Sequence, residues 1–147
     1  MDVQESVIVI IKDQNKLLLQ KNRQWKDLSF IGGKAEQEDA NQPLTTAYRE
    51  VEEELGIVKQ VDFTLSPIEP KLLEFRKFSK RIQKERDYRI FPFLMKFRGE
   101  KDKLTSEENI WVSLENIEAY NNAELPLSDL VKEILPTIQL VGKDSFQ

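Results

Sequence analysis

Three glutamates, Glu50, Glu53 and Glu54, stand close together in the sequence and are the side chains best suited to chemistry. On a helix with about 100° between residues they lie at about 100°, 40° and 140° from Arg49, and so share one narrow face. Like charges at this spacing repel, and the repulsion grows as water is excluded. Mg²⁺ would turn this repulsion into attraction, because it takes carboxylate oxygens and keeps positions for water and phosphate. A lone acidic run is more often a solvated helix face with an Arg49–Glu53 ion pair.

The acidic run is part of a longer pattern. It resembles the box of the Nudix hydrolase family (MutT-like), which reads G-x5-E-x7-R-E-U-x-E-E-x-G-U with U aliphatic, and every position from Arg49 to Ile57 matches. The resemblance implies that Glu50, Glu53 and Glu54 are Mg²⁺ ligands, with Mn²⁺ as a substitute. Glycine permits a close backbone approach, so the Gly33 carbonyl is a plausible further ligand. Glu50 is alternatively a general base.

The upstream half of the box is longer than the family pattern. That pattern has thirteen residues between its glycine and its arginine, whereas fifteen (34–48) separate Gly33 from Arg49. We place two inserted residues within Gln37 to Gln42, just before Pro43, because extra length in a surface loop adds little closure entropy. Either Glu38 or Asp39 then fills the position of the first glutamate.

Composition limits the other possibilities. The chain has 147 residues, 39% apolar and 33% charged, which predicts one soluble domain over residues 1–147. No apolar stretch reaches the ~18 residues of a membrane helix, and the start lacks the order of a signal peptide, so we expect a cytoplasmic protein. With neither cysteine nor histidine, a metal site must use oxygen ligands, which favours Mg²⁺ or Mn²⁺ over zinc. The net charge of −4 gives no reason to expect nucleic-acid binding.

The elements that must position these residues follow from periodicity and turn residues. Pro43 suits a first helical turn and Gly56 a position just past the last, which predicts a helix over 43–55. Leu44, Ala47, Val51 and Leu55 form its predicted buried stripe. A second helix carries apolar residues from Leu127 to Ile138 and should kink or end at Pro136, and a short helix is expected over 115–120. The predicted strands are 7–11 and 16–20 as a hairpin, 28–31, 58–65, 72–78, 88–97 and 110–114.

Pro92 demands a bulge or an edge position in the strand over 88–97. The family resemblance implies an α/β (α+β) fold of the Nudix type, an α/β/α sandwich with a mixed sheet, over nearly the whole chain.

Three further sets of residues are candidates for the site. Glu107 and Glu108 precede a strand with Trp111, and the resemblance favours an acid there as ligand or general base. Glu108 is preferred, although a solvated loop acid is as good an explanation. Arg81, Lys84 and Arg86 belong to a basic hairpin that either binds substrate phosphates or is solvated. An aromatic residue could stack on a base, but in strands such residues are more often core: Trp25, Phe75, Phe78, Tyr88 and Trp111.

The leading hypothesis is a Mg²⁺-dependent hydrolase that cleaves a phosphoanhydride bond in a nucleoside diphosphate linked to another group. The metal would polarise the phosphate bridge and lower the pKa of an attacking water, whose proton a carboxylate removes. We expect a small nucleotide substrate, no membrane partner, and a monomer or homodimer. The rival from another class is a catalytically silent Nudix-fold nucleotide-binding or sensor module. A diphosphate isomerase is less favoured, because the cysteine typical of that chemistry is absent.

Overall fold

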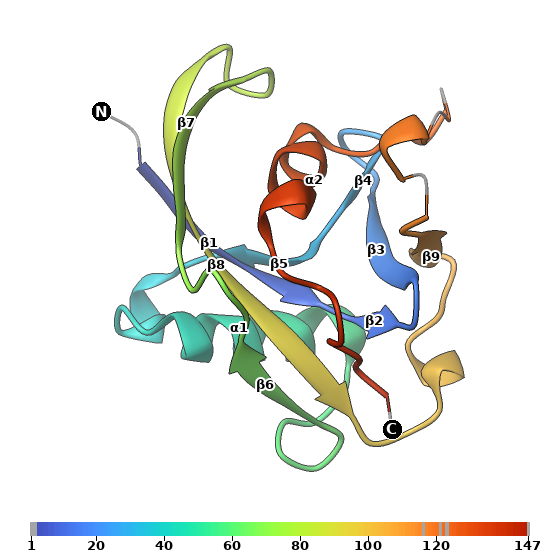
Figure 1. The fold of residues 1–147 in the computed structure, drawn as a ribbon. Coiled ribbons are helices and arrows are strands. Elements are labelled where there is room, and N and C mark those ends of the chain that lie inside the picture. The colour runs from blue at the N-terminus through green and yellow to red at the C-terminus, as the bar shows by residue number, and fades with distance from the viewer. Residues whose placement is uncertain (1–2, 116, 121, 123, 147) are drawn as a thin grey trace.

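A five-stranded mixed sheet and a four-stranded antiparallel sheet form the centre of the molecule (Figure 1). The computed structural model describes residues 3–115, 117–120, 122 and 124–146. In the larger sheet the order is β5-β1-β8-β6, and β7 also pairs with β8. Its strands are β1 (Val3–Ile10), β5 (Ile31–Lys34), β6 (Phe63–Pro67), β7 (Leu73–Ser79) and β8 (Lys84–Phe97). The smaller sheet contains β2 (Lys12–Asp13), β3 (Lys16–Asn22), β4 (Asp27–Ser29) and β9 (Asn109–Ser113).

The predicted hairpin between 7–11 and 16–20 is wrong in its pairing. β1 lies between β5 and β8, whereas β3 pairs with β2, β4 and β9. The chain changes sheets at Ile11, and the actual hairpin joins β2 to β3 around Gln14, whose φ is 56°. The reason is burial, because residues 6–10 of β1 are buried on both faces, as in a central strand of a sheet that is covered on each side.

Two other predicted strands have different bounds. The strand expected over 28–31 is divided into β4 and β5, which belong to different sheets. The strand expected over 58–65 begins only at Phe63. Before it, Asp62 accepts a hydrogen bond from the Val58 N–H (2.7 Å), which holds 58–62 as a turn.

Pro92 occupies neither a bulge nor an edge strand, contrary to the prediction. It lies in β8 opposite Ile8 of β1, in the interior of the sheet. On the other side of β8, pairing with β7 ends at Ile90 and pairing with β6 begins at Phe93. Pro92 therefore falls where one neighbouring strand gives way to the next, and a missing N–H costs the sheet least there.

The helix over 43–55 is confirmed as α1 (Pro43–Leu55), with Pro43 in the first turn and Gly56 following in the left-handed conformation (φ 67°). Ala47 and Val51 are buried as expected, but Leu44 is 42% exposed. Thr46 and Tyr48 are buried in its place, because Thr46 bonds a buried carboxylate and the Tyr48 hydroxyl accepts the Leu65 N–H (2.9 Å).

The second helix is α2 (Asp129–Ile134), shorter than the apolar pattern. The Ser128 hydroxyl caps its start by accepting the Val131 N–H (3.2 Å). Pro136 ends the helix as predicted, in a 3₁₀ turn over Leu135–Thr137. The short helix expected over 115–120 is a 3₁₀ turn at Ile117–Ala119, and two more such turns occur at Gln37–Asp39 and Lys101–Lys103.

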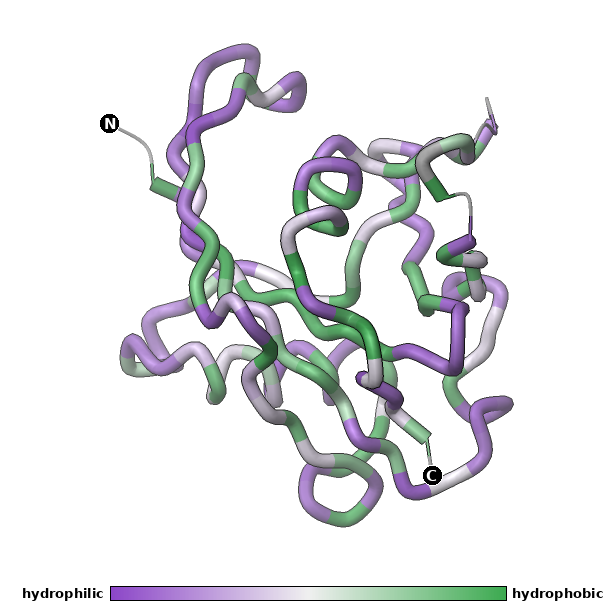
Figure 2. The backbone as a smooth tube through the Cα atoms, in the orientation of Figure 1, coloured by the Kyte–Doolittle hydropathy of each residue, from purple (hydrophilic) through white to green (hydrophobic). Residues whose placement is uncertain are grey.

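Alternate residues of β1 face two separate cores. Val7 and Val9, with Ile11 just past the strand, pack with α1, whereas Ile8 and Ile10 pack with α2. The central strands are accordingly apolar and the tip of the β7–β8 hairpin hydrophilic (Figure 2). This arrangement confirms the mixed α/β/α sandwich. No helix in the described part of the chain is both long and apolar enough to cross a membrane.

The segment after α2 returns to the corner where β1 ends and β2 begins. Ser145 is fully buried, and its hydroxyl accepts the Lys12 N–H at 2.9 Å. The Ser145 N–H donates to the Lys12 carbonyl, and the Ser145 carbonyl accepts the Phe97 N–H, both at 2.8 Å. This residue therefore satisfies the backbone at the corner where the chain changes sheets.

Candidate active site

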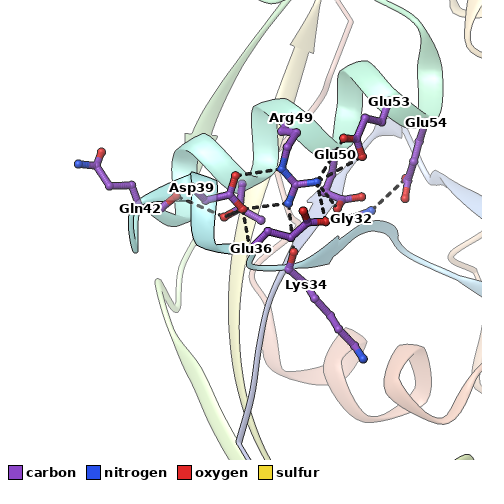
Figure 3. Close-up of polar contacts among 10 residues, drawn as sticks. Gly32, Lys34, Glu36, Asp39, Gln42, Arg49, Glu50, Glu53 and Glu54 are labelled. Carbon is purple, nitrogen blue, oxygen red and sulfur yellow. Dashed lines mark hydrogen bonds and ion pairs between the residues drawn. The ribbon is translucent and has the colours of Figure 1, made fainter.

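Two carboxylates of α1 lie directly against the glycines of β5. The Gly32 N–H donates to Glu54 Oε2 at 3.2 Å (Figure 3). A Cβ at position 33 would stand 2.5 Å from the Glu50 carboxyl carbon, so the carboxylate occupies the space that any other side chain would need. Gly32 has a φ of +146°, and a Cβ there would stand 2.2 Å from the Val7 carbonyl oxygen. Gly32 is therefore required by its own backbone, whereas a side chain at position 33 would displace the Glu50 carboxylate.

Arg49 lies at the centre of the polar network in Figure 3. Its Nε and Nη2 donate to the two carboxylate oxygens of Asp39, each at 2.9 Å. Its Nη1 donates to Glu50 Oε1 at 2.9 Å and to Glu53 Oε2 at 3.2 Å. Such charge-assisted, bidentate contacts fix geometry as well as adding energy. Arg49 thus orients carboxylates from two elements, the 3₁₀ turn at Gln37–Asp39 and α1.

Asp39, not Glu38, is the acid that meets Arg49. Its side chain is 1% exposed, whereas Glu38 is exposed. Asp39 also accepts hydrogen bonds from the Glu36 N–H (2.9 Å) and the Thr46 hydroxyl (2.8 Å). The hydrogen bonds from Arg49 lower the pKa of Asp39 well below its usual range, in spite of burial.

The turn after Asp39 can accommodate the two extra residues of the box. Ala40 and Asn41 both adopt left-handed backbone conformations, with φ of 53° and 61°. This pair reverses the chain between the 3₁₀ turn and Pro43, so the spacing from Gly33 to Asp39 is that of the family pattern.

Glu50 and Glu54 form a mutually repelling pair. Burial is the main cause that raises the pKa of Glu54 to about 8, and the neighbouring Glu50 charge raises it further. Burial also raises the pKa of Glu50, although Arg49 opposes the shift. Two partly buried carboxylates that share a site in this way fit a divalent cation, which would replace the proton they otherwise need.

Glu53 departs from the predicted three-carboxylate face. Its side chain is 59% exposed and turns toward Arg49. Among the residues that the structure describes, no three acidic side chains gather as a metal-binding group. The three carboxylates thus divide into a pair, Glu50 and Glu54, and a separate Glu53.

A cleft of about 890 Å³ begins at Gly32, Gly33 and Glu54 and extends between the β7–β8 hairpin and α2. Arg81 and Arg86 line it, and Lys84 does not. The volume suits a small-molecule ligand. Of the five candidate aromatics, the cleft is lined by Trp25, Phe78 and Tyr88. Phe75 stacks on Tyr88 (5.2 Å between centroids), and Trp111 packs on Phe146 (5.9 Å).

Three ion pairs join the hairpin to the opposite wall of the cleft. Arg81 Nη2 lies 3.3 Å from Asp27 Oδ2, and its guanidinium lies 5.0 Å from the centre of the Trp25 ring. The other two pairs join the hairpin to acids of α2: Lys80–Asp129 (3.7 Å) and Lys77–Glu133 (3.6 Å). Much of the hairpin's positive charge is therefore already balanced within the chain.

Glu108 lies outside the cleft. Its carboxylate forms an ion pair with Arg23, whose Nε lies 3.1 Å from Oε1. This contact lowers the pKa of Glu108. Glu107 and Glu108 line a separate hollow of about 430 Å³, which shares Asn22 with the cleft. The structure therefore does not bring Glu108 together with Glu50 and Glu54, and its role stays a prediction.

Sequence reasoning missed the polar residues contributed by strands. Gln4, Ser6 and Asp27 all line the cleft. For β1 a signal was present, because Gln4 and Ser6 precede Ile8 and Ile10 at the strand period of two. Such a row changes from polar to apolar where a sheet face passes from a cleft into a core.

Comparison with known families and structures agrees with this geometry. Residues 2–134 match the NUDIX domain. A NUDIX hydrolase from Nitrosomonas europaea superposes with a TM-score of 0.62 at 18% identity, covering 97% of this chain and 92% of that one. A MutT NUDIX hydrolase from Burkholderia pseudomallei gives 0.59 at 17%, covering 95% and 100%. The Ap4A hydrolase of C. elegans gives 0.53 at 18%, covering 79% and 83%. A search among curated proteins found no match.

Proposed function

Because this chain belongs to the NUDIX family, whose members generally cleave a nucleoside diphosphate linked to another moiety, we propose that it hydrolyses such a substrate with Mg²⁺ or Mn²⁺. The bond broken is a phosphoanhydride in the substrate's diphosphate. The cation is held by Glu50 and Glu54, with the Gly33 backbone beside them. Glu53 joins them only if it leaves Arg49, to which it is bonded at 3.2 Å.

The observation that carries the proposal is the carboxylate pair against the glycine strand. Glu50 and Glu54 are held close together in a partly buried position, where burial and mutual repulsion raise the pKa of Glu54 to about 8. Arg49 pairs with Glu50, but among the described residues no lysine or arginine forms an ion pair with Glu54. A site that concentrates negative charge at the end of a ligand-sized cleft is suited to a hard cation and a phosphate.

The bound cation supplies charge stabilisation at the diphosphate and a lowered pKa of the attacking water. The chain's own residues supply the geometry. Arg49 bonds Glu50 Oε1 and leaves Oε2 without that contact. We assign Glu50 Oε2 as the atom that takes the proton of the water. The Gly32 N–H holds Glu54 Oε2, which fixes the second carboxylate.

Replacing one member of the pair tests the assignment. Glu54→Gln should lower kcat by about 10²–10⁴-fold while the protein remains folded, because the carboxylate charge is lost and the shape is kept. Glu52→Gln is the matched control, since Glu52 is an exposed acid of the same helix. Turnover is measured with Mg²⁺ and with EDTA on nucleotide sugars, dinucleoside polyphosphates, ADP-ribose, oxidised dNTPs and capped RNA.

Equal turnover by Glu54→Gln and Glu52→Gln would refute the cation site. Tight binding of a panel member by the wild type with no turnover in Mg²⁺ or Mn²⁺ would instead establish a binding or sensor module. Turnover that persists in EDTA would refute the metal requirement.

A further inference from the structure

One face of the central sheet changes from apolar to polar as it leaves the core. On β1, Ile8 and Ile10 are buried beneath α2, and Ser6 and Gln4 continue the same row into the cleft. On the neighbouring β8, Tyr88 and Ile90 are buried, and Arg86 continues that row. The far floor of the cleft is therefore built by Gln4, Ser6 and Arg86, none of which belongs to the box.

These three side chains are linked by hydrogen bonds. Arg86 Nη1 donates to Gln4 Oε1, and Gln4 Nε2 donates to Ser6 Oγ at 3.0 Å. Because the amide uses its oxygen toward the guanidinium and its nitrogen toward the hydroxyl, both contacts fix its orientation. Gln4 thus holds the Arg86 guanidinium without neutralising it.

The charge of Arg86 has no counter-charge in the described part of the chain. No carboxylate there lies within ion-pair distance, and Arg86 Nε is buried without a hydrogen-bond partner. Its cross-strand neighbour on β7 is Lys77, another cation. On the other face of the same strands, Arg89 pairs with Glu74 at 3.1 Å. A partly buried, unpaired charge is costly, and an anion in the cleft would remove that cost.

Arg86 is far from the diphosphate proposed to be cleaved. Gly33 lies opposite Val7, and Val7 lies opposite Phe91, five residues beyond Arg86 along β8. Two strand spacings of about 4.8 Å and five residues at about 3.3 Å place the Gly33 and Arg86 Cα atoms roughly 19 Å apart. An arginine side chain shortens this gap but does not close it.

We propose that Arg86, held by Gln4, binds an anionic group at the end of the substrate remote from the cleaved diphosphate. The inference rests on the proposed function of this cleft and names its substrate class: nucleoside diphosphates that carry an additional phosphate or carboxylate. Both groups match a guanidinium through paired hydrogen bonds.

Matched substrate pairs test the proposal and separate the two sources of negative charge. UDP-glucose and UDP-glucuronate differ by a carboxylate, and ADP-ribose and its 2′-phosphate differ by a phosphate. In the wild type, the anionic member of at least one pair should have the higher kcat/KM by about 10–100-fold, as expected for a hydrogen bond to a charged group. Arg86→Gln should abolish this preference, because kcat/KM for the anionic member should fall by about that factor more than kcat/KM for the neutral member.

Arg89→Gln is the control, because Arg89 is a paired arginine on the opposite face of β8. It should keep the preference. The melting temperature of Arg86→Gln should be unchanged or higher, since an unpaired charge is removed. Preference for the phosphate alone, for the carboxylate alone, or for both identifies the group that is bound.

Titration calorimetry in EDTA separates this proposal from the proposed function. If the wild type hydrolyses no pair, the proposed function fails, yet tighter binding of an anionic member that requires Arg86 still supports the inference. No preference in the wild type for either anionic member, or a preference that survives Arg86→Gln, overturns it. An equal loss for both members of each pair would also overturn it, because that pattern shows a structural role.

Discussion

Arg49 orients carboxylates near one end of the cleft, and Arg86 lines the other end. The charges that surround the two guanidinium groups differ. Arg49 is surrounded by Asp39, Glu50 and Glu53, all within 3.2 Å of its guanidinium nitrogens. Within the described part of the chain, Arg86 bonds the neutral amide of Gln4 and faces Lys77 across the strands. A compensated arginine builds geometry, because its donors are fully used by the chain. An uncompensated arginine keeps its donors for a ligand. The chemistry and the proposed selectivity are thereby separated in space.

The largest effect is expected when the ion pair between Arg49 and Asp39 is removed. Asp39→Asn removes the buried carboxylate of a bidentate ion pair with Arg49, so the free energy of unfolding should fall by about 3 kcal/mol. Asp87→Asn is the control, because Asp87 makes a similar contact with Arg76 (2.8 Å) on an exposed face. It should cost less than about 1 kcal/mol. Urea unfolding measures both free energies. Equal losses would show that the buried contact of Arg49 stabilises the fold no more than the exposed contact of Arg76.

The second effect concerns the space beside Glu50. Gly33→Ala places a Cβ where the carboxylate lies, so the carboxylate must move while the fold remains. We expect kcat to fall by about 10²-fold, the usual cost of misplacing a reacting group by about 1 Å.

Gly56→Ala provides the reverse pattern. Gly56 has a φ of 67° and open space around it, so alanine strains only the backbone. The variant should lose about 1 kcal/mol of stability and keep its kcat. A Gly33→Ala variant with wild-type kcat would show that Glu50 does not act from its present position.

The third effect is a pH dependence of stability in the metal-free protein. The pKa of Glu54 is about 8 in the folded protein, above the ordinary 4.5. The folded state therefore binds more protons than the unfolded state between these values, and the free energy of unfolding contributed by Glu54 falls as the pH rises through that window. Asp39 has the opposite sign, because its lowered pKa gives stability that is lost only on acidification.

Glu54→Gln should remove the downward slope. Urea unfolding in EDTA between about pH 5 and about pH 9 measures the difference from wild type. Parallel curves for the two proteins would contradict the raised pKa of Glu54.

A smaller effect is expected from the ion pairs across the cleft. Arg81→Ala removes the Asp27 contact and the cation above Trp25, and should change KM by no more than about five-fold at low salt. The change should shrink at high salt, where exposed charges are screened. Lys84→Ala should behave as the wild type, because Lys84 does not line the cleft. An equal change of KM in both variants would show that KM depends on the overall positive charge of the hairpin and not on the contacts of Arg81.

The smallest effect is expected from Glu108→Gln. Since Glu108 is paired with Arg23 outside the cleft, kcat should remain within about three-fold of the wild type, and Glu107→Gln should match it. A loss of about 10²-fold or more in one variant alone would move the general base from Glu50 to that loop.

The box could be predicted from the sequence because its geometry is local. Pro43 and Gly56 delimit α1, and the spacing of 3.6 residues per turn puts Glu50 and Glu54 on one face. For Glu53 the sequence left two positions open, the shared carboxylate face and an ion pair with Arg49, and the structure shows the ion pair at 3.2 Å. The choice of Asp39 over Glu38 depends on the left-handed residues after it.

The far floor of the cleft is built by residues far apart in the sequence, so most of it could not be predicted. Arg86 was among the candidates only as part of a basic hairpin, together with Lys84, which does not line the cleft. Its relation to Gln4 spans 82 residues and requires the parallel register of β1 and β8. The same ignorance of register produced the wrong hairpin between β1 and β3, since a strand's period tells which face a residue takes but not which strand lies beside it.

The contact between Lys12 and Ser145 has a consequence for the timing of synthesis. The two residues are 133 positions apart, so at about 5–20 residues per second the ribosome needs roughly 7–27 s to deliver Ser145 after Lys12. Until then the corner between the two sheets keeps an open backbone N–H and carbonyl, which another nascent chain can pair with. A slow translation of the segment after α2 should therefore lower the yield of folded protein without changing the stability of the molecules that finish.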